Sequence, residues 1–223
     1  MVFDSHFHIV DPRFPLVGGY RPAPFTVADY RAATAGLGVS GGAVVAGSFQ
    51  GFDQTYLLEA LERLGPGFVG VTQLPPAVSD EEILALDRAG VRAVRFNLRR
   101  GGALDVDLAL RVYQLAGWHT EVYASDLPAH EDRLRALPRL CVDHLGMNPE
   151  GLAAAVRLGA MVKATPRFEG DLHAVDPDRL LFGTDLPGTR TPRRFRPADL
   201  ERVREVAPAA LGENARRWYR LPD

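Results

Sequence analysis

The chain has 223 residues, of which 46% are hydrophobic and 24% charged, and its formal net charge is −2. The composition is that of a globular protein, and the chain is long enough to bury one large core. The near-neutral charge gives no reason to expect nucleic acid or a membrane surface as a partner. No apolar run approaches the roughly 18 residues of a membrane-spanning helix, and the first residues form a strand pattern in place of a secretion signal. Cys141 is the only cysteine, so no intrachain disulfide can form and we expect a cytoplasmic location.

Strand and helix patterns alternate from the first residues onward. The first strand is expected within residues 1–12, MVFDSHFHIVDP, where apolar residues alternate with Asp4, His6 and His8. After a loop rich in proline and glycine, Thr26 and Asp29 have the spacing of a capping box that begins a helix. The patterns then predict a strand at 40–50, a helix at 53–64, a strand at 68–74, a helix at 79–89 and a strand at 91–98.

The second half continues this alternation. The patterns predict a helix at 107–116, a strand at 118–124, a helix at 131–137, a strand at 140–146, a helix at 149–158, and strands at 160–166 and 179–187. Eight strands alternating with helices predict a (β/α)8 TIM barrel, an α/β fold, formed by residues 1–223 as a single domain. Only residues 167–178 separate the last two strands, so we expect a compact barrel with a shortened or missing helix between strands 7 and 8. The sequence alone does not distinguish a genuine shortening from absent loop residues.

Polar side chains collect where the expected strands end, and in a TIM barrel that end carries the active site. His6 and His8 lie two residues apart, so their imidazoles share one face of the first strand. Such a pair can hold a metal ion or polarise a carbonyl. The other strands contribute Ser48, Gln50, Gln73, Arg95, Asn97, Arg99, Arg100, Tyr123, Asp143, His144, Lys163, Thr165, Arg167 and Asp185.

Five segments resemble the amidohydrolase superfamily, and within it the branch of 2-pyrone-4,6-dicarboxylate lactonases and related TIM-barrel hydrolases. They are FDSHFHIVDP, VRFNLRR, VDHLG, LLFGTDLP and GENARRWYRL. The similarity runs nearly from end to end, and its specific part is the combination of His-x-His with a strand-six histidine and a strand-eight aspartate. The resemblance implies a TIM-barrel hydrolase, but it defines the substrate less closely because this fold hosts many reactions.

The resemblance also implies roles for four residues. Asp185 is expected to be the general base that activates water, or a metal ligand that also handles the proton. His6, His8 and His144 are expected to surround the scissile carbonyl, as ligands of a divalent ion or as direct hydrogen-bond donors. Either arrangement supplies positive charge or donors at the carbonyl oxygen, where negative charge develops during attack.

The sequence leaves the metal open. Binuclear relatives carry a bridging lysine or glutamate on strand four, where this chain has Arg95 and Asn97, so two ions are not expected. His119 lies near the start of its strand, at the wrong end of the barrel for a ligand. The resembled lactonases lack that ligand and are thought to work without metal. We therefore expect either no required cofactor or one divalent ion, with Zn²⁺ the best match to His6, His8, His144 and Asp185.

The expected substrate is a small anionic molecule, because arginine forks suit carboxylates. The expected substrate-binding residues are Ser48, Arg95, Asn97, Arg99, Arg100, Tyr123 and Arg167. The arginines have an alternative interpretation as exposed, salt-bridging residues. The basic run 190–196 is expected to be a solvated loop, and Cys141 to face the helices as a packed thiol.

Together these features predict a hydrolase that opens a small carboxylated lactone, acting as a monomer or small homo-oligomer. One alternative is a mononuclear metal-dependent hydrolase or decarboxylase on the same barrel. Another is a barrel that binds a ligand without catalysis, because a lost helix before strand eight would loosen Asp185.

Overall fold

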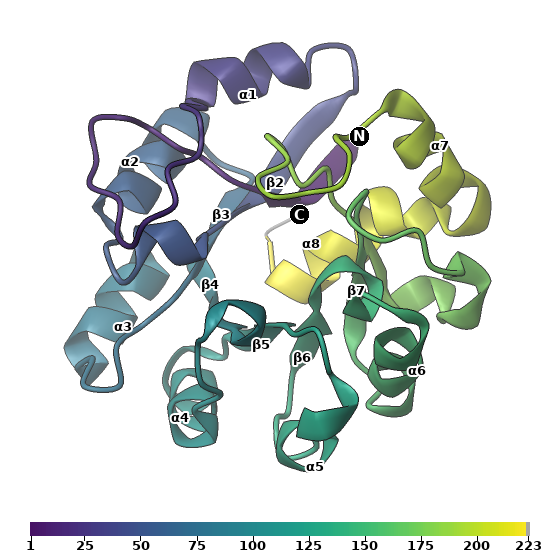
Figure 1. Ribbon diagram of the computed structural model, residues 1–223. Helices are drawn as coiled ribbons and strands as arrows, with labels where there is room; N and C mark the ends of the chain where they lie inside the picture. Colours follow the sequence, from purple (N-terminus) through teal and green to yellow (C-terminus); the bar gives the residue numbers. More distant parts are fainter. Residues whose placement is uncertain (222–223) are drawn as a thin grey trace.

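The computed structural model describes residues 1–221, so residues 222–223 of the predicted domain lie outside the described part. Eight strands form one sheet in the order β1 to β8, and every neighbouring pair in that order is parallel. Figure 1 shows α1 to α7 around the outside of the strands and α8 across the middle of the view. The predicted TIM barrel is therefore confirmed.

The elements follow the predicted order, with shorter strands than expected. The strands are β1 (Val2–Phe7), β2 (Val39–Val45), β3 (Phe68–Thr72), β4 (Val91–Asn97), β5 (His119–Tyr123), β6 (Leu140–Val142), β7 (Met161–Ala164) and β8 (Leu180–Phe182). The helices are α1 (Val27–Ala33), α2 (Thr55–Leu64), α3 (Asp80–Arg88), α4 (Val106–Ala116), α5 (Glu131–Leu134), α6 (Pro149–Arg157), α7 (Pro197–Val206) and α8 (Glu213–Tyr219). A capping box begins α1 at Thr26, as its spacing predicted, and another begins α3 at Ser79.

The connection from β7 to β8 contains no α-helix, as expected from its length. Two single 3-10 turns, Leu172–Ala174 and Pro177–Arg179, take the place of a helix. Each turn begins at an aspartate, Asp171 or Asp176, whose side chain accepts a backbone N–H of the turn. These local caps order a connection that is too short for a helix and its loops.

The barrel closes through the segment that follows β8. The Asp185 N–H donates to the carbonyl of His6 (2.7 Å), and the His8 N–H donates to the carbonyl of Leu186 (2.8 Å). Below this level, the buried Asp4 carboxylate accepts the N–H and hydroxyl of Thr184, at 2.8 and 2.7 Å. The closure therefore places His6, His8 and Asp185 next to one another at the top of the barrel.

The lower barrel interior contains an apolar cluster that α8 covers. Phe3 and Leu181 from the strands pack in one cluster with Tyr219 of α8, whose ring stacks on Phe3 at 5.3 Å between centroids. Cys141 belongs to this interior cluster, so the expectation that it faces the helices was wrong. The strand alternation between Cys141 and His144 does not hold, because β6 ends at Val142 and His144 has a left-handed φ of 55°.

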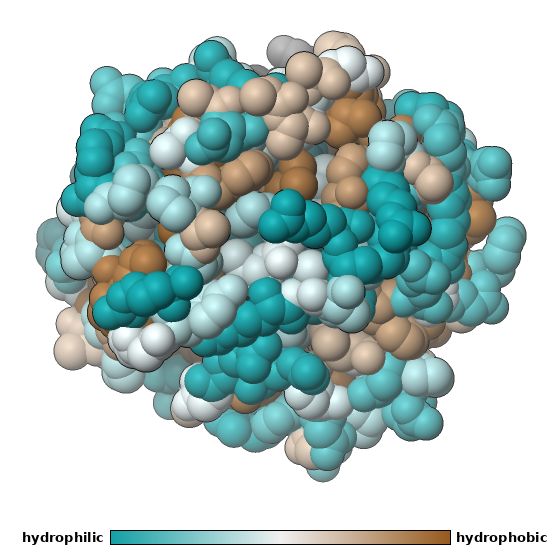
Figure 2. Space-filling view, turned by 45° about the horizontal axis from the view of Figure 1, so that its top comes forward, coloured by the Kyte–Doolittle hydropathy of each residue, from teal (hydrophilic) through white to brown (hydrophobic). Residues whose placement is uncertain are grey.

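The molecular surface mixes polar and apolar residues. On the face that Figure 2 turns forward, hydrophilic side chains lie around the middle with smaller hydrophobic areas between them. Within residues 1–221, no helix combines the length and the apolar character needed to cross a bilayer.

Replacing Asp4 tests the importance of the closure. Asp4→Ala leaves the buried Thr184 donors and the Tyr30 hydroxyl without their acceptor, which should lower the free energy of unfolding by roughly 2 to 4 kcal/mol. Urea denaturation measures the change. Glu62→Ala, on the exposed side of α2, is the control and should change stability by less than about 0.5 kcal/mol. If Asp4→Ala lowered the free energy of unfolding no more than Glu62→Ala does, the Asp4 contacts would not stabilise the barrel.

Candidate active site

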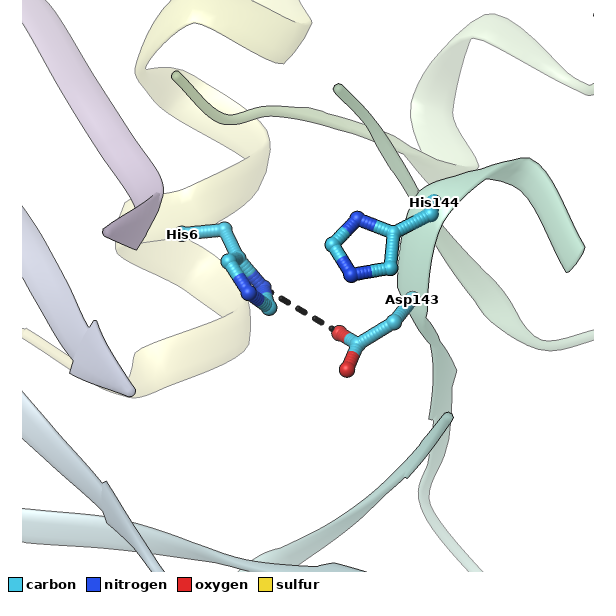
Figure 3. A group of neighbouring side chains, drawn as sticks. All are labelled: His6, Asp143 and His144. Atoms are coloured by element: carbon cyan, nitrogen blue, oxygen red, sulfur yellow. Dashed lines mark ion pairs between the residues drawn. The ribbon is translucent and has the colours of Figure 1, made fainter. Parts of the chain in front are cut away.

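The chain turns sharply after β6 and presents the side chains of Asp143 and His144 to the barrel axis (Figure 3). His144 and Leu145 have left-handed φ values of 55° and 51°, which non-glycine residues adopt only when their surroundings hold them. His144 Nδ1 lies 2.7 Å from the Thr165 hydroxyl, which fixes the orientation of its ring. Figure 3 shows His144 and Asp143 pointing toward His6 from the opposite side.

His6 of β1 and His8, which follows this strand, both present Nε2 to Asp185. The His8 Nδ1–H donates to the Val45 carbonyl (2.7 Å), so a neutral His8 has a lone pair on Nε2, which lies 3.4 Å from Asp185 Oδ1. His6 Nδ1 lies 3.2 Å from Asp143 Oδ1, and its Nε2 lies 3.8 Å from Asp185 Oδ1 (Figure 3). An anionic neighbour favours the His6 proton on Nδ1, which leaves a second Nε2 lone pair directed at the same carboxylate.

Asp185 is held from several sides. The φ of Asp185, 53°, is left-handed, and its N–H donates to the His6 carbonyl. Its Oδ2 pairs with Arg167 Nη2 at 2.9 Å. Burial would raise the pKa of Asp185, but its contact with His8, the neighbouring imidazoles of His144 and His6, and the positive charge of Arg167 outweigh burial and lower that pKa. Asp185 is therefore a rigid, ionised carboxylate. The short β7–β8 connection does not loosen it.

Asp143 is a buried residue of the site to which we assigned no role from the sequence. Its Oδ2 accepts Nε and Nη2 of Arg95 at 2.9 and 2.8 Å, and its Oδ1 faces His6. Burial would raise the pKa of Asp143, but Arg95, His6 and Lys163 lower it well below its usual range. Asp143 therefore orients His6 and neutralises most of the Arg95 charge. The only sequence signal was its place beside His144 at the end of a strand.

The buried imidazoles are neutral near pH 7. Burial is the largest cause that lowers the pKa of His6, to about 4, against the opposing charge of Asp143. Burial likewise lowers the pKa of His144 well below its ordinary value. Neutral rings can accept a proton, donate one, or bind a metal.

A cavity opens above these residues, with about 340 Å³ of empty space when its solvent-open mouth is included. It is lined by His8, Gly47, Ser48, Phe49, Arg95, Asn97, Arg100, Tyr123, His144, Arg167, Thr189 and Arg190. His6 and Asp185 are not in its lining and lie one layer below, against His8 and His144. A molecule in the cavity would touch His8 and His144 first.

Six of the seven predicted substrate-binding residues line this cavity, and Arg99 does not. Arg99 is exposed and donates to the Ser125 hydroxyl at 2.6 Å, because β4 ends at Asn97 and a 3-10 turn at Leu98–Arg100 directs it outward. Arg190, which we expected in a solvated loop, lines the cavity. No local pattern marks Arg190, because the β8–α7 loop brings it there.

The cavity is strongly cationic. Arg95 and Arg167 are paired with Asp143 and Asp185, but within residues 1–221 the guanidinium groups of Arg100 and Arg190 form no ion pair with a carboxylate. Burial, followed by the charges of Arg190, Arg99 and Arg167, lowers the pKa of Arg100 despite the opposite effect of Tyr123. Two unneutralised arginines in one cavity favour an anionic ligand.

The opposite end of the barrel holds His119. Its Nε2 lies 3.1 Å from Glu121 Oε1, and its ring lies 5.0 Å from the Trp218 ring, between centroids. Glu121 in turn pairs with Lys163 Nζ at 2.6 Å. His119 therefore belongs to a buried network below the site.

Two groups of donor atoms are close enough to hold a metal ion: His6, His8 and Asp185, and His6, Asp143 and His144. In the first group, His6 Nε2 and Asp185 Oδ1 are buried and accept no hydrogen bond from any described residue. In the second group, Asp143 is already paired with Arg95. The first group is therefore the better fit for one divalent ion.

Comparisons with known sequences identify hydrolases. A family model described as amidohydrolase matches residues 3–221. A 2-pyrone-4,6-dicarboxylate hydrolase of Comamonas testosteroni is 33% identical over 157 residues, which cover 64% of this chain and 51% of that protein. A 4-sulfomuconolactone hydrolase of Rhizobium radiobacter is 26% identical over 237 residues, covering 86% and 78%. The match to the Comamonas protein thus spans about half of its length.

Solved structures share the fold. A protein of Agrobacterium tumefaciens, crystallised without ligand, superposes with a TM-score of 0.84 at 21% identity, covering 99% of this chain and 96% of that one. A structure from Acinetobacter baumannii with citric acid bound, named as a "probable 2-pyrone-4,6-dicarboxylic acid hydrolase", gives a TM-score of 0.82 at 16% identity and covers 99% of both chains. At these identities the likeness shows the fold alone.

The buried neutral histidines predict how stability depends on pH. Burial lowers the pKa values of both His6 and His119 to about 4, below the roughly 6.5 of an unfolded histidine. Between these values the unfolded chain binds more protons, so the free energy of unfolding should fall as pH drops from about 7 to about 4. Each histidine contributes up to roughly 3 kcal/mol.

Urea denaturation at about pH 7 and about pH 5 measures this dependence. His119→Gln keeps a donor toward Glu121 but does not titrate, so it should reduce the difference between the two pH values. An unchanged difference would mean that His119 is not buried in its neutral form.

Proposed function

Because the chain belongs to the amidohydrolase family, matched over residues 3–221, we propose that it hydrolyses the ester bond of a small carboxylated lactone in the cationic cavity. The observation that carries this proposal is that the arginines of the cavity lie directly above a cluster of histidines and aspartates. Arginines with uncompensated charge line the cavity, and a histidine–aspartate cluster lies directly beneath it. The names of two relatives, a 2-pyrone-4,6-dicarboxylate hydrolase and a 4-sulfomuconolactone hydrolase, support a lactone as substrate.

In this proposal Asp185 is the base. A water molecule beside Oδ1 gives its proton to the carboxylate while its oxygen attacks the lactone carbonyl. The ring C–O bond then breaks, the leaving oxygen takes the proton that Asp185 accepted, and the new carboxylic acid releases its own proton to solvent to become a carboxylate. The strong pairing with Arg167 makes Asp185 a weak base, so its contribution depends on close positioning of the water by His8.

His144 is proposed to stabilise the carbonyl oxygen. If the Thr165 hydroxyl donates to Nδ1, the ring proton lies on Nε2 and can bind the oxygen as negative charge develops there. His8 and His6 differ, because their Nδ1 atoms face acceptors, so that in a neutral ring Nε2 carries the lone pair. Their part in carbonyl polarisation therefore needs a proton or a metal ion between them and Asp185.

The arginines are proposed to bind the substrate carboxylates. Arg100 and Arg190 have uncompensated charge, whereas Arg95 is mostly neutralised by Asp143. Arg95 is therefore a weaker clamp than its sequence position suggested. Tyr123 places its hydroxyl, buried and without a partner in the described chain, at the cavity, where it can donate to a ring or carboxylate oxygen.

The second candidate is a mononuclear metal-dependent hydrolase or decarboxylase on the same barrel. The two Nε2 lone pairs directed at Asp185 Oδ1 favour it, since His6, His8 and Asp185 would hold one Zn²⁺. When bound, such an ion supplies a Lewis acid and lowers the pKa of bound water. We further propose a cytoplasmic location, a small anionic partner, and a monomer or small homo-oligomer.

Removing the base tests the primary proposal. Asp185→Asn keeps the shape of the side chain but cannot accept the proton, so lactone turnover should fall by roughly 10²- to 10⁴-fold. Circular dichroism checks that the variant is folded. Asp107→Asn, at an exposed position on α4, is the control and should keep full activity. Activity that survives in Asp185→Asn would exclude Asp185 as the base.

Adding and removing metal tests the second candidate. We expect Zn²⁺ to raise the thermal midpoint of the purified protein, because a ligand that binds only the folded state stabilises it. His8→Asn should remove this shift, and its absence in the parent protein would exclude a Zn²⁺ site. Lactone turnover that survives chelation supports the metal-independent lactonase, and turnover lost on chelation and restored by Zn²⁺ supports the metal-dependent enzyme.

A further inference from the structure

An arginine–tyrosine stack joins two loops at the mouth of the cavity. The Arg190 guanidinium carbon lies 3.6 Å from the centre of the Tyr20 ring, the closest cation–π contact in residues 1–221. Tyr20 belongs to the β1–α1 loop and Arg190 to the β8–α7 loop. Arg190 lines the inner cavity, although its side chain is exposed and finds no carboxylate in the described chain.

Both partners of the stack are tied to the walls of the cavity. The Arg190 carbonyl accepts a hydrogen bond from Arg167 Nη1 at 2.9 Å. This contact supports the left-handed φ of Arg190, 53°. The Tyr20 ring packs 5.9 Å from the Phe49 ring, and the Val17 N–H donates to the Phe49 carbonyl at 2.8 Å. The β1–α1 loop is thus attached to Phe49, and the β8–α7 loop to Arg167. These two attachments hold the Tyr20 ring against the Arg190 guanidinium.

The stack also separates two hollows. Outside it lies a second, mostly apolar groove of about 920 Å³, lined by Tyr20, Pro22, Phe25, Leu186, Thr189 and Arg194 among others. Thr189 borders both the groove and the inner cavity, Tyr20 borders only the groove, and Arg190 only the cavity. The two stacked side chains therefore form the partition.

We propose that Tyr20 is a positioning and specificity-determining residue, which holds Arg190 over the inner cavity and limits the size of the lactone that fits. Without the ring, Arg190 turns toward solvent and an anion in the cavity loses one partner. The inner cavity also becomes continuous with the groove, so a lactone with an apolar substituent fits. The size limit rests on the proposed function, whereas the effect on anion binding does not.

A double-mutant cycle with citrate measures the positioning role, because citrate is a tricarboxylate that the proposed reaction does not consume. Tyr20→Leu should weaken citrate binding about three- to fivefold in calorimetry, and Tyr20→Phe, which keeps the aromatic face, should stay within about twofold. Arg190→Gln should weaken binding about tenfold. In the Arg190→Gln background, Tyr20→Leu should have no further effect.

The positioning role would be overturned if Tyr20→Leu weakened citrate binding as much in the Arg190→Gln background as in the parent protein. It would also be overturned if Tyr20→Phe weakened citrate binding as much as Tyr20→Leu does. Both side chains are on surface loops, and an unchanged thermal midpoint checks that each variant is folded. A parent protein that does not bind citrate at all would also overturn it.

The size limit is tested by kinetics on a carboxylated lactone and on the same lactone with a butyl substituent. Tyr20→Leu should raise KM for the small lactone with kcat nearly unchanged, and should improve kcat/KM for the substituted lactone relative to the small one about tenfold or more. An unchanged ratio would overturn the partition. If no lactone is turned over by the parent protein, the proposed function fails while the citrate cycle still tests the positioning role.

Discussion

The site depends on one buried carboxylate, that of Asp143, which binds Arg95 with one oxygen and faces His6 with the other. Its charge balances the guanidinium within the barrel, while Lys163 balances Glu121 one layer below. Removing one partner of such a buried pair costs roughly 3 to 5 kcal/mol, because the other charge stays uncompensated. Stability and the orientation of the His6 imidazole are therefore set by the same contact.

The barrel closure brings the rest of the site together. The segment after β8 pairs with β1 through backbone hydrogen bonds at His6 and His8, and these bonds also fix Asp185. The shortened β7–β8 connection leaves this arrangement intact, because Asp185 is held by the closure and by Arg167. The non-catalytic interpretation thus loses the structural reason that suggested it.

Periodicity and strand count predicted the barrel, its element order and the shortened connection, because each depends on local patterns and on length. The placing of His6, His8, His144 and Asp185 at one end followed from their positions along the strands. The directions of the Cys141 and Arg99 side chains could not be predicted, because they depend on where each strand ends. β6 ends before His144 in a left-handed turn, which reverses the expected direction of Cys141, and a 3-10 turn directs Arg99 away. Arg190 reaches the cavity only through loop packing, which no local pattern reports.

The central claim is that the cavity selects a carboxylated lactone for hydrolysis. Its most direct test is to measure kcat/KM for one lactone as the free carboxylate and as its uncharged methyl ester, at low and at high ionic strength. We expect turnover of the carboxylate, with a preference of roughly ten- to a hundredfold over the ester that shrinks as salt screens the arginines. Equal or faster hydrolysis of the ester, unaffected by salt, would contradict it.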